Sequence, residues 1–427
     1  MSRRLGVGLL GVGWMGALHT RSYRRLADHY PELDVTFELV AAADPDPRRR
    51  RRAVEQLGYG RADEDWRSVV EDPGVDVVSV TSPNYLHREM ALGVIAANKQ
   101  LWVEKPVGTS VAQTEQVALA AAAAGTVGAV GFNYRHVPLI EHAVSLVAGG
   151  SLGAITGVRG WFLNDYASDP RGPINWRFLR SEAGSGVLGD LMSHVVDLAA
   201  AIVGPLSEVV ASTDVVIGRR PLASGDADHF SVVATDRGPV MPEGGMPSVP
   251  VENEDSARAL VHFAGGATGF LEAGRAVVGP HCSLGIAVYG SAGSLLWDFE
   301  RMNEMDLYLA DAPGDPGYRR VLARPGHGDY ARFQPGPAIS MGYDDLKVVE
   351  AARFVRAVLG GEPCAPGLAE AVSAAQAIDA MERSAVSRSW EPVSSAGPAV
   401  GSQRATVAPG PEVTRTREGA SQRTDQV

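Results

Sequence analysis

Short apolar runs alternate with longer stretches of mixed polarity through the first third of the chain. The apolar runs predict strands at residues 5–10, 38–43, 75–80, 100–103 and 126–132. The stretches between them predict helices at residues 17–29, 47–57, 66–70, 88–97 and 110–124. Strands that alternate with helices indicate a parallel, doubly wound sheet. In such a sheet, ligands bind beyond the carboxyl ends of the strands.

The pattern changes after a helix predicted at residues 137–148. A strand at residues 155–162 and a helix at residues 190–203 precede a segment rich in predicted strands, and two helices close the pattern. The later strands are predicted at residues 209–216, 229–235, 257–263, 267–273, 283–290, 294–298 and 306–310, and the closing helices at residues 344–359 and 367–384. We therefore expect two α/β domains, over residues 1–135 and 136–395. Residues 396–427 are rich in Ser, Gly, Pro and Thr and are expected to form a disordered tail.

Composition narrows the class of protein. The chain has 427 residues, a formal net charge of −11 and a balanced content of apolar and charged residues. The acidic net charge argues against non-specific nucleic-acid binding, which needs a basic face. Two widely separated cysteines favour a reducing compartment. We find no apolar run of about 20 residues, as a spanning helix requires, and expect a cytoplasmic protein with no membrane partner.

A glycine-rich turn follows the first predicted strand. Gly11 would permit the tight turn, Gly13 would let a pyrophosphate approach the backbone, and Gly16 would let helix and strand pack closely. The helix N-terminus then presents free N–H groups to phosphates. In a chain with 49 glycines the G-x-G-x-x-G pattern is weak evidence by itself. The candidate cofactor residues of this turn are Gly11, Val12, Gly13, Trp14, Met15 and Gly16.

Asp44 ends the second predicted strand, where an acid commonly holds the diol of a ribose. The alternative is a turn residue in an Asp-Pro-Asp-Pro sequence. Arg48 and Arg49 follow it, either as a solvated helical turn, which we prefer, or as contacts to a 2′-phosphate. Since Asp44 would repel such a phosphate, NAD is favoured as cofactor, with NADP as the alternative.

Candidate ligand-binding residues follow the ends of the next three strands. Because the carboxyl ends of parallel strands meet at one edge, these residues are expected to line one crevice. They are Thr81, Pro83, Asn84 and His87 after the third strand, Glu104 and Lys105 after the fourth, and Asn133, Tyr134 and Arg135 after the fifth.

Asp190 and His194 lie four residues apart in a predicted helix, so both side chains share one face, and Asp197 follows one turn later. By spacing alone we prefer an acid in a first helical turn and a core histidine. A metal site is a weaker alternative, because no further ligands accompany the pair.

Four motifs together resemble one family of NAD(P)-dependent oxidoreductases, the glucose–fructose oxidoreductase, inositol dehydrogenase and rhizopine catabolism family. The resemblance covers about residues 4–395. The motifs are Gly11-x-Gly13-x-x-Gly16, Thr81-x-Pro83-Asn84-x-x-His87, Glu104-Lys105-Pro106 and Asp190-x-x-x-His194. The resemblance implies an N-terminal Rossmann domain and a C-terminal α/β domain with an open, mostly antiparallel sheet. It also implies homodimers or homotetramers formed through that sheet.

The resemblance implies a catalytic group of Lys105, Asp190 and His194 and no metal. A hydride transfer to nicotinamide needs a proton acceptor, and an imidazole suits that role. His194 is then the base, Asp190 holds it, and Lys105 donates to the substrate oxygen. The alternative, in which a desolvated Lys105 is itself the base, stays open.

The expected substrate is a sugar or polyol whose secondary hydroxyl becomes a ketone. The run Asn133-Tyr134-Arg135, Asp169-Pro170 with Trp176-Arg177-Phe178, and Gly184-Ser185-Gly186 resembles the branch of the family that contains levoglucosan dehydrogenase-like sugar dehydrogenases. The alternatives are an NADPH-dependent reductase of keto- or anhydro-sugars and a non-catalytic dinucleotide-binding protein. Candidate substrate residues, besides the three catalytic ones, are Tyr134, Arg135, Asn164, Asp165, Trp176 and Arg177.

Overall fold

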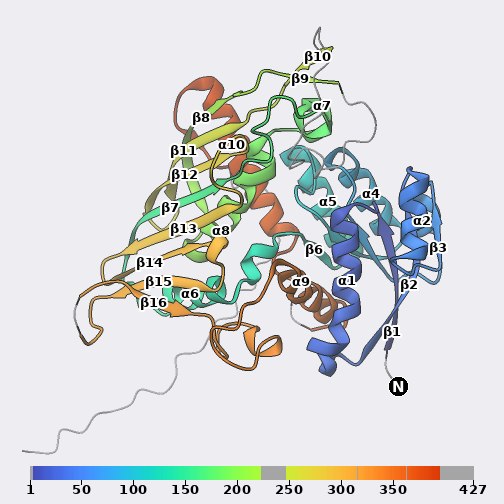
Figure 1. Ribbon diagram of the computed structural model, residues 1–427, viewed down its shortest axis with the longest axis horizontal. Helices are drawn as coiled ribbons and strands as arrows, with labels where there is room; N and C mark the ends of the chain where they lie inside the picture. The colour runs from blue at the N-terminus through green and yellow to red at the C-terminus, as the bar shows by residue number, and fades with distance from the viewer. Residues whose placement is uncertain (1–2, 223–246, 315, 362, 395–427) are drawn as a thin grey trace, which may run out of the picture. The chain divides into compact units, whose positions relative to one another are not determined.

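The computed structural model describes residues 3–222, 247–314, 316–361 and 363–394 (Figure 1). The strand expected at residues 229–235 and the tail expected at residues 396–427 lie outside the described residues. The two large sheets of the described chain belong to one compact unit, Met1–Ala396. The domain boundary expected near residue 135 therefore stays a prediction.

The first sheet has six parallel strands in the order β3-β2-β1-β4-β5-β6. Its strands are β1 Arg3–Leu10, β2 Val35–Ala43, β3 Arg61–Asp63, β4 Val77–Val80, β5 Gln100–Val103 and β6 Gly128–Val130. The predicted parallel, doubly wound sheet is confirmed. Strand β3 has no predicted counterpart, because three half-buried residues at a sheet edge, two of them charged, leave no apolar run.

Helices cover both faces of the first sheet. Helices α1 and α2 pack on one face, together with a helix from the end of the chain, α9, while α3, α4 and α5 pack on the other. Their bounds are α1 Trp14–His29, α2 Pro47–Glu55, α3 Arg67–Val70, α4 Asn84–Ala96, α5 Val111–Ala124 and α9 Tyr343–Val358. Helix α4 was predicted from residue 88 but begins at Asn84, so Asn84 and His87 stand in its first turn.

The second sheet has nine strands in the order β16-β15-β14-β13-β7-β12-β11-β8-β17. Only β7 and β12 pair in parallel among these described strands, so the sheet is mostly antiparallel, as expected. A small hairpin joins β9 Arg219–Pro221 to β10 Ser248–Pro250. The nine strands are β7 Ile155–Leu163, β8 Leu206–Asp214, β11 Ser256–Phe263, β12 Thr268–Gly274, β13 Ser283–Gly290, β14 Gly293–Asp298, β15 Glu304–Leu309, β16 Arg319–Leu322 and β17 Glu391–Pro392.

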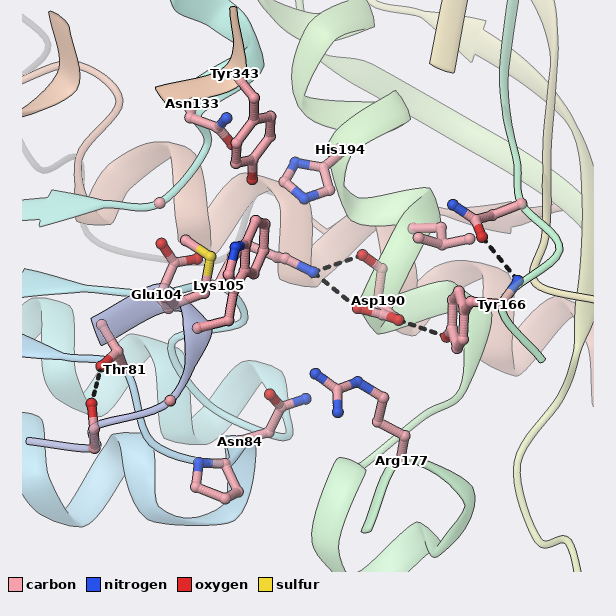
Figure 2. Close-up of a pocket in the computed structure, with 18 of the residues that line it drawn as sticks. Thr81, Asn84, Glu104, Lys105, Asn133, Tyr166, Arg177, Asp190, His194 and Tyr343 are labelled. Atoms are coloured by element: carbon pink, nitrogen blue, oxygen red, sulfur yellow. Dashed lines mark hydrogen bonds and ion pairs between the residues drawn. The ribbon is translucent and has the colours of Figure 1, made fainter. Parts of the chain in front are cut away.

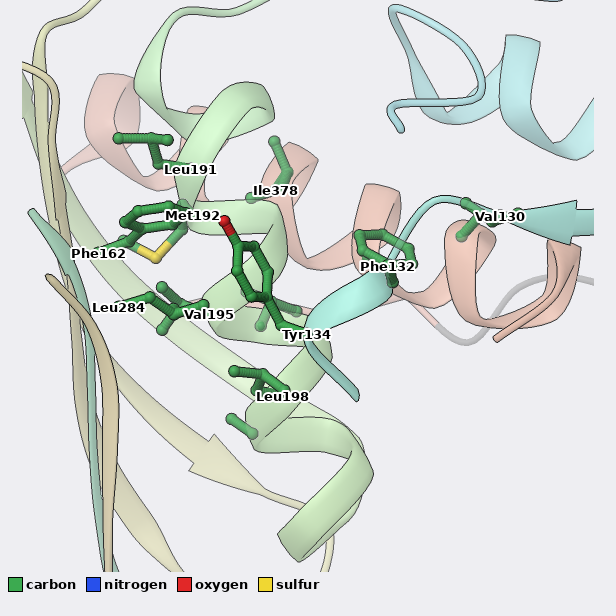
Figure 3. Packing of buried hydrophobic residues seen from close by; sticks show 14 of the residues in the cluster. Val130, Phe132, Tyr134, Phe162, Leu191, Met192, Val195, Leu198, Leu284 and Ile378 are labelled. Carbon is green, nitrogen blue, oxygen red and sulfur yellow. The ribbon is translucent and has the colours of Figure 1, made fainter. Parts of the chain in front are cut away.

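Helix α8 (Ser193–Val203) covers one face of this sheet, with α6 (Pro138–Ala148) and α10 (Leu368–Ser387) beside it (Figure 1). Figure 3 shows the packing of Val195 and Leu198 of α8 near Tyr134, Phe162 and Leu284. The short α7 (Arg180–Ala183) precedes α8. The buried face of α8 thus packs on the second sheet and also on Tyr134, which follows the last strand of the first sheet.

One described helical segment, Arg180–Val203, is long and apolar enough to cross a membrane by length and composition alone. The sequence therefore contains one apolar stretch of this kind, and the expectation that it contains none is wrong. In the structure, 78% of its apolar window is buried inside the protein. Core helices of soluble proteins have this property.

Helix α9 returns to the first sheet and packs along α1 (Figure 1). Arg21 Nε of α1 lies 2.8 Å from the Asp344 carboxylate, and Arg25 lies 2.6 Å from that of Asp345. The N-terminus of α9 is therefore fixed beside the glycine-rich turn. The family resemblance implies that the closing helices pack back on the first domain, and α9 packs on α1 of that domain.

Candidate active site

A cavity of about 700 Å³ lies beyond the carboxyl ends of the parallel strands (Figure 2). The predicted crevice and the second sheet share its wall, because residues of β7 and of the turn Leu188–Met192 line it together with residues of α4 and those that follow β5. Nineteen of the predicted site residues line it. They are Gly11, Gly13, Trp14, Met15, Asp44, Thr81, Pro83, Asn84, His87, Glu104, Lys105, Asn133, Tyr134, Asn164, Asp165, Trp176, Arg177, Asp190 and His194.

The glycine-rich turn forms one end of the cavity. Gly11 has φ +95°, and a Cβ on it would come within 3 Å of the backbone at Thr81 and Ser82. A Cβ on Gly16 would lie 2.3 Å from the carbonyl oxygen of Gly11, so this glycine lets α1 pack on β1 without lining the cavity. Gly13 has open space on its Cβ side, where a phosphate needs access to the backbone.

Asp44 stands at the end of β2 and is buried. Its Oδ2 accepts a hydrogen bond from the Val12 backbone N–H at 2.8 Å, and its Oδ1 accepts one from Asp46 N–H at 3.0 Å. Val12 itself is buried and does not line the cavity. Arg49 lines the cavity with Nη1 3.8 Å from Asp44 Oδ2, whereas Arg48 pairs with Asp46. This end of the cavity thus holds one acid and one guanidinium.

Lys105 lies at the centre of the cavity (Figure 2). Its Nζ donates to the backbone oxygen of Asp190 at 2.7 Å and to Asp190 Oδ1 at 3.0 Å. The other carboxylate oxygen of Asp190 accepts a hydrogen bond from the Tyr166 hydroxyl at 2.7 Å. Asp190 was expected to hold His194, but these hydrogen bonds place its carboxylate on Lys105 and Tyr166.

The local backbone explains this change of partner. Asp190 lies in a π-helical turn, Leu188–Met192, and α8 begins only at Ser193. The expected α-helix from Asp190 is therefore wrong in its first turn. A π-turn widens the helix and alters the direction of its side chains relative to the four-residue spacing.

His194 is buried among aromatic edges. The ring centroids of Tyr134, Phe132 and Phe162 lie 4.8, 5.7 and 6.0 Å from that of the imidazole. Burial, and after it the charge of Lys105, holds the pKa of His194 well below its usual value. The imidazole is therefore neutral near pH 7, the form that accepts a proton.

His87 connects two loops of the cavity wall. Its ring nitrogens lie 2.6 Å from the carbonyl oxygen of Ser82 and 2.7 Å from that of Pro106. The Lys105–Pro106 peptide bond is cis. His87 therefore fixes the turn after β4 against the turn that carries Lys105.

Arg135 is one predicted substrate residue that the structure places elsewhere. It lies outside the cavity wall and forms two hydrogen bonds of 2.7 Å with the buried carboxylate of Asp197. Burial raises the pKa of Asp197, and the guanidinium opposes this rise. Arg135 is therefore not a substrate residue in this structure, because its guanidinium forms the ion pair that links the short 3-10 helix Asn133–His136 to α8.

The other predicted substrate residues line the end of the cavity near the second sheet. Asp165 Oδ2 lies 2.7 Å from Nδ1 of His281, and the Arg177 guanidinium stacks 4.2 Å from the Trp176 ring centroid. Ten further lining residues were missed by the sequence analysis, and five of them lie outside helices and strands. They are Ser82, Gly131, Phe162, Tyr166, Leu191, His281, Cys282, Phe299, Tyr343 and Asp344.

Comparison with known proteins identifies the family. Residues 5–132 match the oxidoreductase family with an NAD-binding Rossmann fold, and residues 140–296 match the GFO/IDH/MocA C-terminal domain. Levoglucosan dehydrogenase of Pseudarthrobacter phenanthrenivorans is 34% identical over 91% of this chain and 98% of its own length. The chain belongs to the GFO/IDH/MocA oxidoreductase family. It is an oxidoreductase with an NAD-binding Rossmann fold.

Other members of the GFO/IDH/MocA family are similar over most of the chain. Myo-inositol 2-dehydrogenase of Thermotoga maritima is 25% identical over 84% of this chain and 89% of its own length. Among solved structures, levoglucosan dehydrogenase in complex with NADH and levoglucosan has a TM-score of 0.84 and 31% identity, and covers 92% of this chain and 100% of that one. An oxidoreductase domain protein from Kribbella flavida has a TM-score of 0.83 at 34% identity, with 92% and 100% coverage.

Proposed function

We propose that this oxidoreductase oxidises a secondary hydroxyl of a sugar, glycoside or inositol to a ketone, with NAD as hydride acceptor. The observation that carries the proposal is the convergence of Lys105, Asp190 and a neutral, buried His194 in the cavity that also contains the glycine-rich turn. The similarity to levoglucosan and inositol dehydrogenases supports the substrate class.

The residues of the glycine-rich turn fit a dinucleotide. The positive φ of Gly11, the open Cβ side of Gly13 and the N-terminus of α1 suit a pyrophosphate, and Asp44 suits a ribose diol. When bound, the cofactor supplies a nicotinamide that accepts hydride. We place Thr81, Pro83, Asn84 and Asn133 along the cofactor, since they line the cavity between this turn and Lys105.

We assign the base role to His194 and the donor role to Lys105. An ammonium has three N–H bonds, and Lys105 uses hydrogen bonds to two acceptors of Asp190, which leaves one donor for a substrate oxygen. That donor stabilises the developing alkoxide. The neutral imidazole of His194 takes the hydroxyl proton. Asp190 thus holds the ammonium of Lys105 in place, and the hydrogen bond from the Tyr166 hydroxyl holds the carboxylate of Asp190.

For the substrate we propose a ring with an apolar face and several hydroxyls. Tyr134 and Phe162 offer an aromatic wall near His194, whereas Asn164, Asp165 and Arg177 offer polar groups. The Trp176 ring already stacks on Arg177, so it acts with this guanidinium as one surface. Proteins commonly bind sugars through such mixed surfaces of aromatic rings and polar groups.

The proposed function is tested by NADH formation at 340 nm with a panel of pyranoses, glycosides, anhydro-sugars and inositols. We expect turnover with at least one member of the panel and faster turnover with NAD than with NADP. Absence of turnover with every member, in both directions and with both cofactors, would remove the dehydrogenase assignment.

The cofactor assignment of Asp44 gives a separate prediction. Loss of a hydrogen bond between a charged group and a ligand costs about 1.5–3 kcal/mol, so Asp44→Ala should weaken NAD binding about tenfold or more. NADP binding should weaken less, because the repulsion of a 2′-phosphate is removed too. Isothermal titration with each cofactor measures this, and Asp46→Ala, whose carboxylate pairs with Arg48 outside the cavity wall, is the matched control. An unchanged ratio of the two affinities would remove Asp44 from the cofactor site.

We also propose a homo-oligomer formed through the second sheet, in a cytoplasmic setting. Helices α8 and α10 cover one face, and no described helix covers the other. Leu260, Tyr289 and Leu296 lie on strands of this sheet and are exposed. Their removal from water would stabilise a dimer or tetramer. Light scattering of the Leu260→Lys variant tests the sheet as the interface.

A further inference from the structure

A buried group of charged side chains lies directly behind the turn that carries Lys105, where α1, β5 and α9 meet. Lys347 Nζ lies 2.5 Å from Glu104 Oε1 and 2.9 Å from Glu350 Oε1. His19 Nε2 lies 3.0 Å from the same oxygen of Glu104, and Trp102 Nε1 donates to Glu350 at 2.6 Å. The mechanism proposed above uses none of these groups, although Glu104 lines the cavity.

The ionisation of this group follows from its burial and its contacts. Burial opposes the charge of Glu104, but Lys347 and then His19 hold the pKa of this carboxyl below its usual range. Burial lowers the pKa of His19 to about 4, so its imidazole is neutral near pH 7. Burial raises the pKa of Glu350. Lys347 and Glu104 are therefore the ionised pair, and a buried ammonium without such a partner is costly.

His19, Glu104 and Glu350 also meet the distance requirement of a metal site. The ammonium of Lys347 is bound to both carboxylates of this set, at the distances given above. A cation of this chain thus already neutralises these ligands. The set therefore supports an internal ion pair rather than a metal ion.

Glu104 connects this pair to the catalytic turn. It precedes Lys105 in sequence, and its backbone N–H donates to the carbonyl oxygen of Val80 at 2.9 Å. A Cβ on Gly131 would lie 2.4–2.6 Å from the carboxyl atoms of Glu104, so the glycine leaves the space that this carboxylate occupies. One turn before Lys347, Tyr343 of α9 lines the cavity itself. Helix α9 therefore contacts both the cavity and the residue beside Lys105.

We propose that Lys347 is a positioning residue of the hydride-transfer site, which acts through Glu104 to hold the turn that carries Lys105. The proposal rests on the proposed function. Without Lys347, the buried carboxylate of Glu104 loses its ionised partner and must move toward water or take a proton. Either change shifts the turn between β5 and Pro106, and the contact of Lys105 with Asp190 changes with it.

A double-mutant cycle tests this proposal on the full chain. We expect Lys347→Met to lower kcat at least tenfold while KM for the sugar stays within twofold, because the substrate groups of the second sheet are untouched. In the Glu104→Gln background, Lys347→Met should change kcat less than twofold, because Glu104→Gln has already removed the carboxylate through which Lys347 acts. Lys99→Met is the matched control and should keep kcat, since Lys99 Nζ donates only to the backbone oxygens of Asp72 and Val75 in the described contacts, outside the cavity.

Hydrogen exchange tests the role of Lys347 without a measurement of turnover. The backbone amide of Glu104 should exchange at least tenfold faster in Lys347→Met than in the wild type, and the Lys99→Met control should leave it unchanged. An unchanged exchange rate, or an equal loss of kcat from Lys347→Met in both backgrounds, overturns the proposal. If Lys347→Met does not fold, kcat of Glu104→Gln is compared with kcat of the double variant. A tenfold difference between these two values overturns the proposal. Absence of turnover in the wild type would defeat the proposed function alone, since exchange still tests Lys347.

Discussion

The Lys105→Met variant is expected to lose about 10²–10³-fold in kcat, the effect of removing one donor to a developing oxyanion. NADH affinity should stay within a few-fold, because the phosphate and ribose groups lie at the glycine-rich turn. The physical reason is the geometry of the ammonium. Asp190 accepts hydrogen bonds from Nζ through both its backbone oxygen and its carboxylate, and the third N–H remains for the substrate. Met keeps the length of the side chain without the charge.

Stopped-flow or steady-state kinetics measure kcat, and the quenching of protein fluorescence measures NADH affinity. Lys99→Met serves as the control for loss of a lysine next to the same strand, since Lys99 directly precedes β5. A parallel loss of NADH affinity would mean that Lys105 contacts the cofactor rather than the substrate. An unchanged kcat would remove it from the reaction.

Five of the six strands of the first sheet were predictable, because each contains a buried apolar run, whereas the half-buried β3 contains none. Val77–Val80 and Gln100–Val103 are short apolar runs that end at turn residues, and each predicted strand position matches an observed strand. The crevice followed from topology alone, since parallel strands bring their carboxyl ends to one edge. For the same reason Lys105 could be placed at the cavity before any contact was known.

The second sheet contributes residues that no local pattern marks. Cys282 and Phe299 line the cavity because strands β13 and β14 pair next to β7, more than a hundred residues away in sequence. Tyr343 does so because α9 returns to α1 through ion pairs with Arg21 and Arg25. Long-range pairing of this kind leaves no periodicity in a single sequence.

Two site residues show where sequence reasoning about side chains failed. Arg135 follows a strand end as expected, yet Asp197, 62 residues later, binds its guanidinium outside the cavity. Asp190 has the expected spacing from His194, but the π-helical turn brings its carboxylate to Lys105 and Tyr166. The position of Arg135 after a strand was predictable, whereas the π-helical turn at Asp190 was not, and in both cases the partner of the charge depended on three-dimensional contacts.

The His194→Gln variant is expected to lose about 10²–10⁴-fold in kcat for oxidation, the usual contribution of a general base. Gln keeps a polar side chain of similar size but accepts no proton near pH 7. His142→Gln is the matched control, since His142 is only partly buried, stacks on His327 and lies outside the cavity. An equal loss in both variants would indicate a general effect on folding rather than a missing base.

The pH dependence of kcat/KM tests the same role with a defined sign. Oxidation requires the neutral imidazole, and burial together with Lys105 holds the pKa of His194 well below its usual value of 6.5. The wild-type rate should therefore stay constant as pH falls through 6.5 and decrease only in more acidic solution. Because Lys105 lowers this pKa, Lys105→Met should raise it, and the decrease in its residual rate should begin at higher pH than in the wild type. A decrease that begins at the same pH in both proteins would mean that another group is the base, since only a base beside Lys105 feels the loss of its charge.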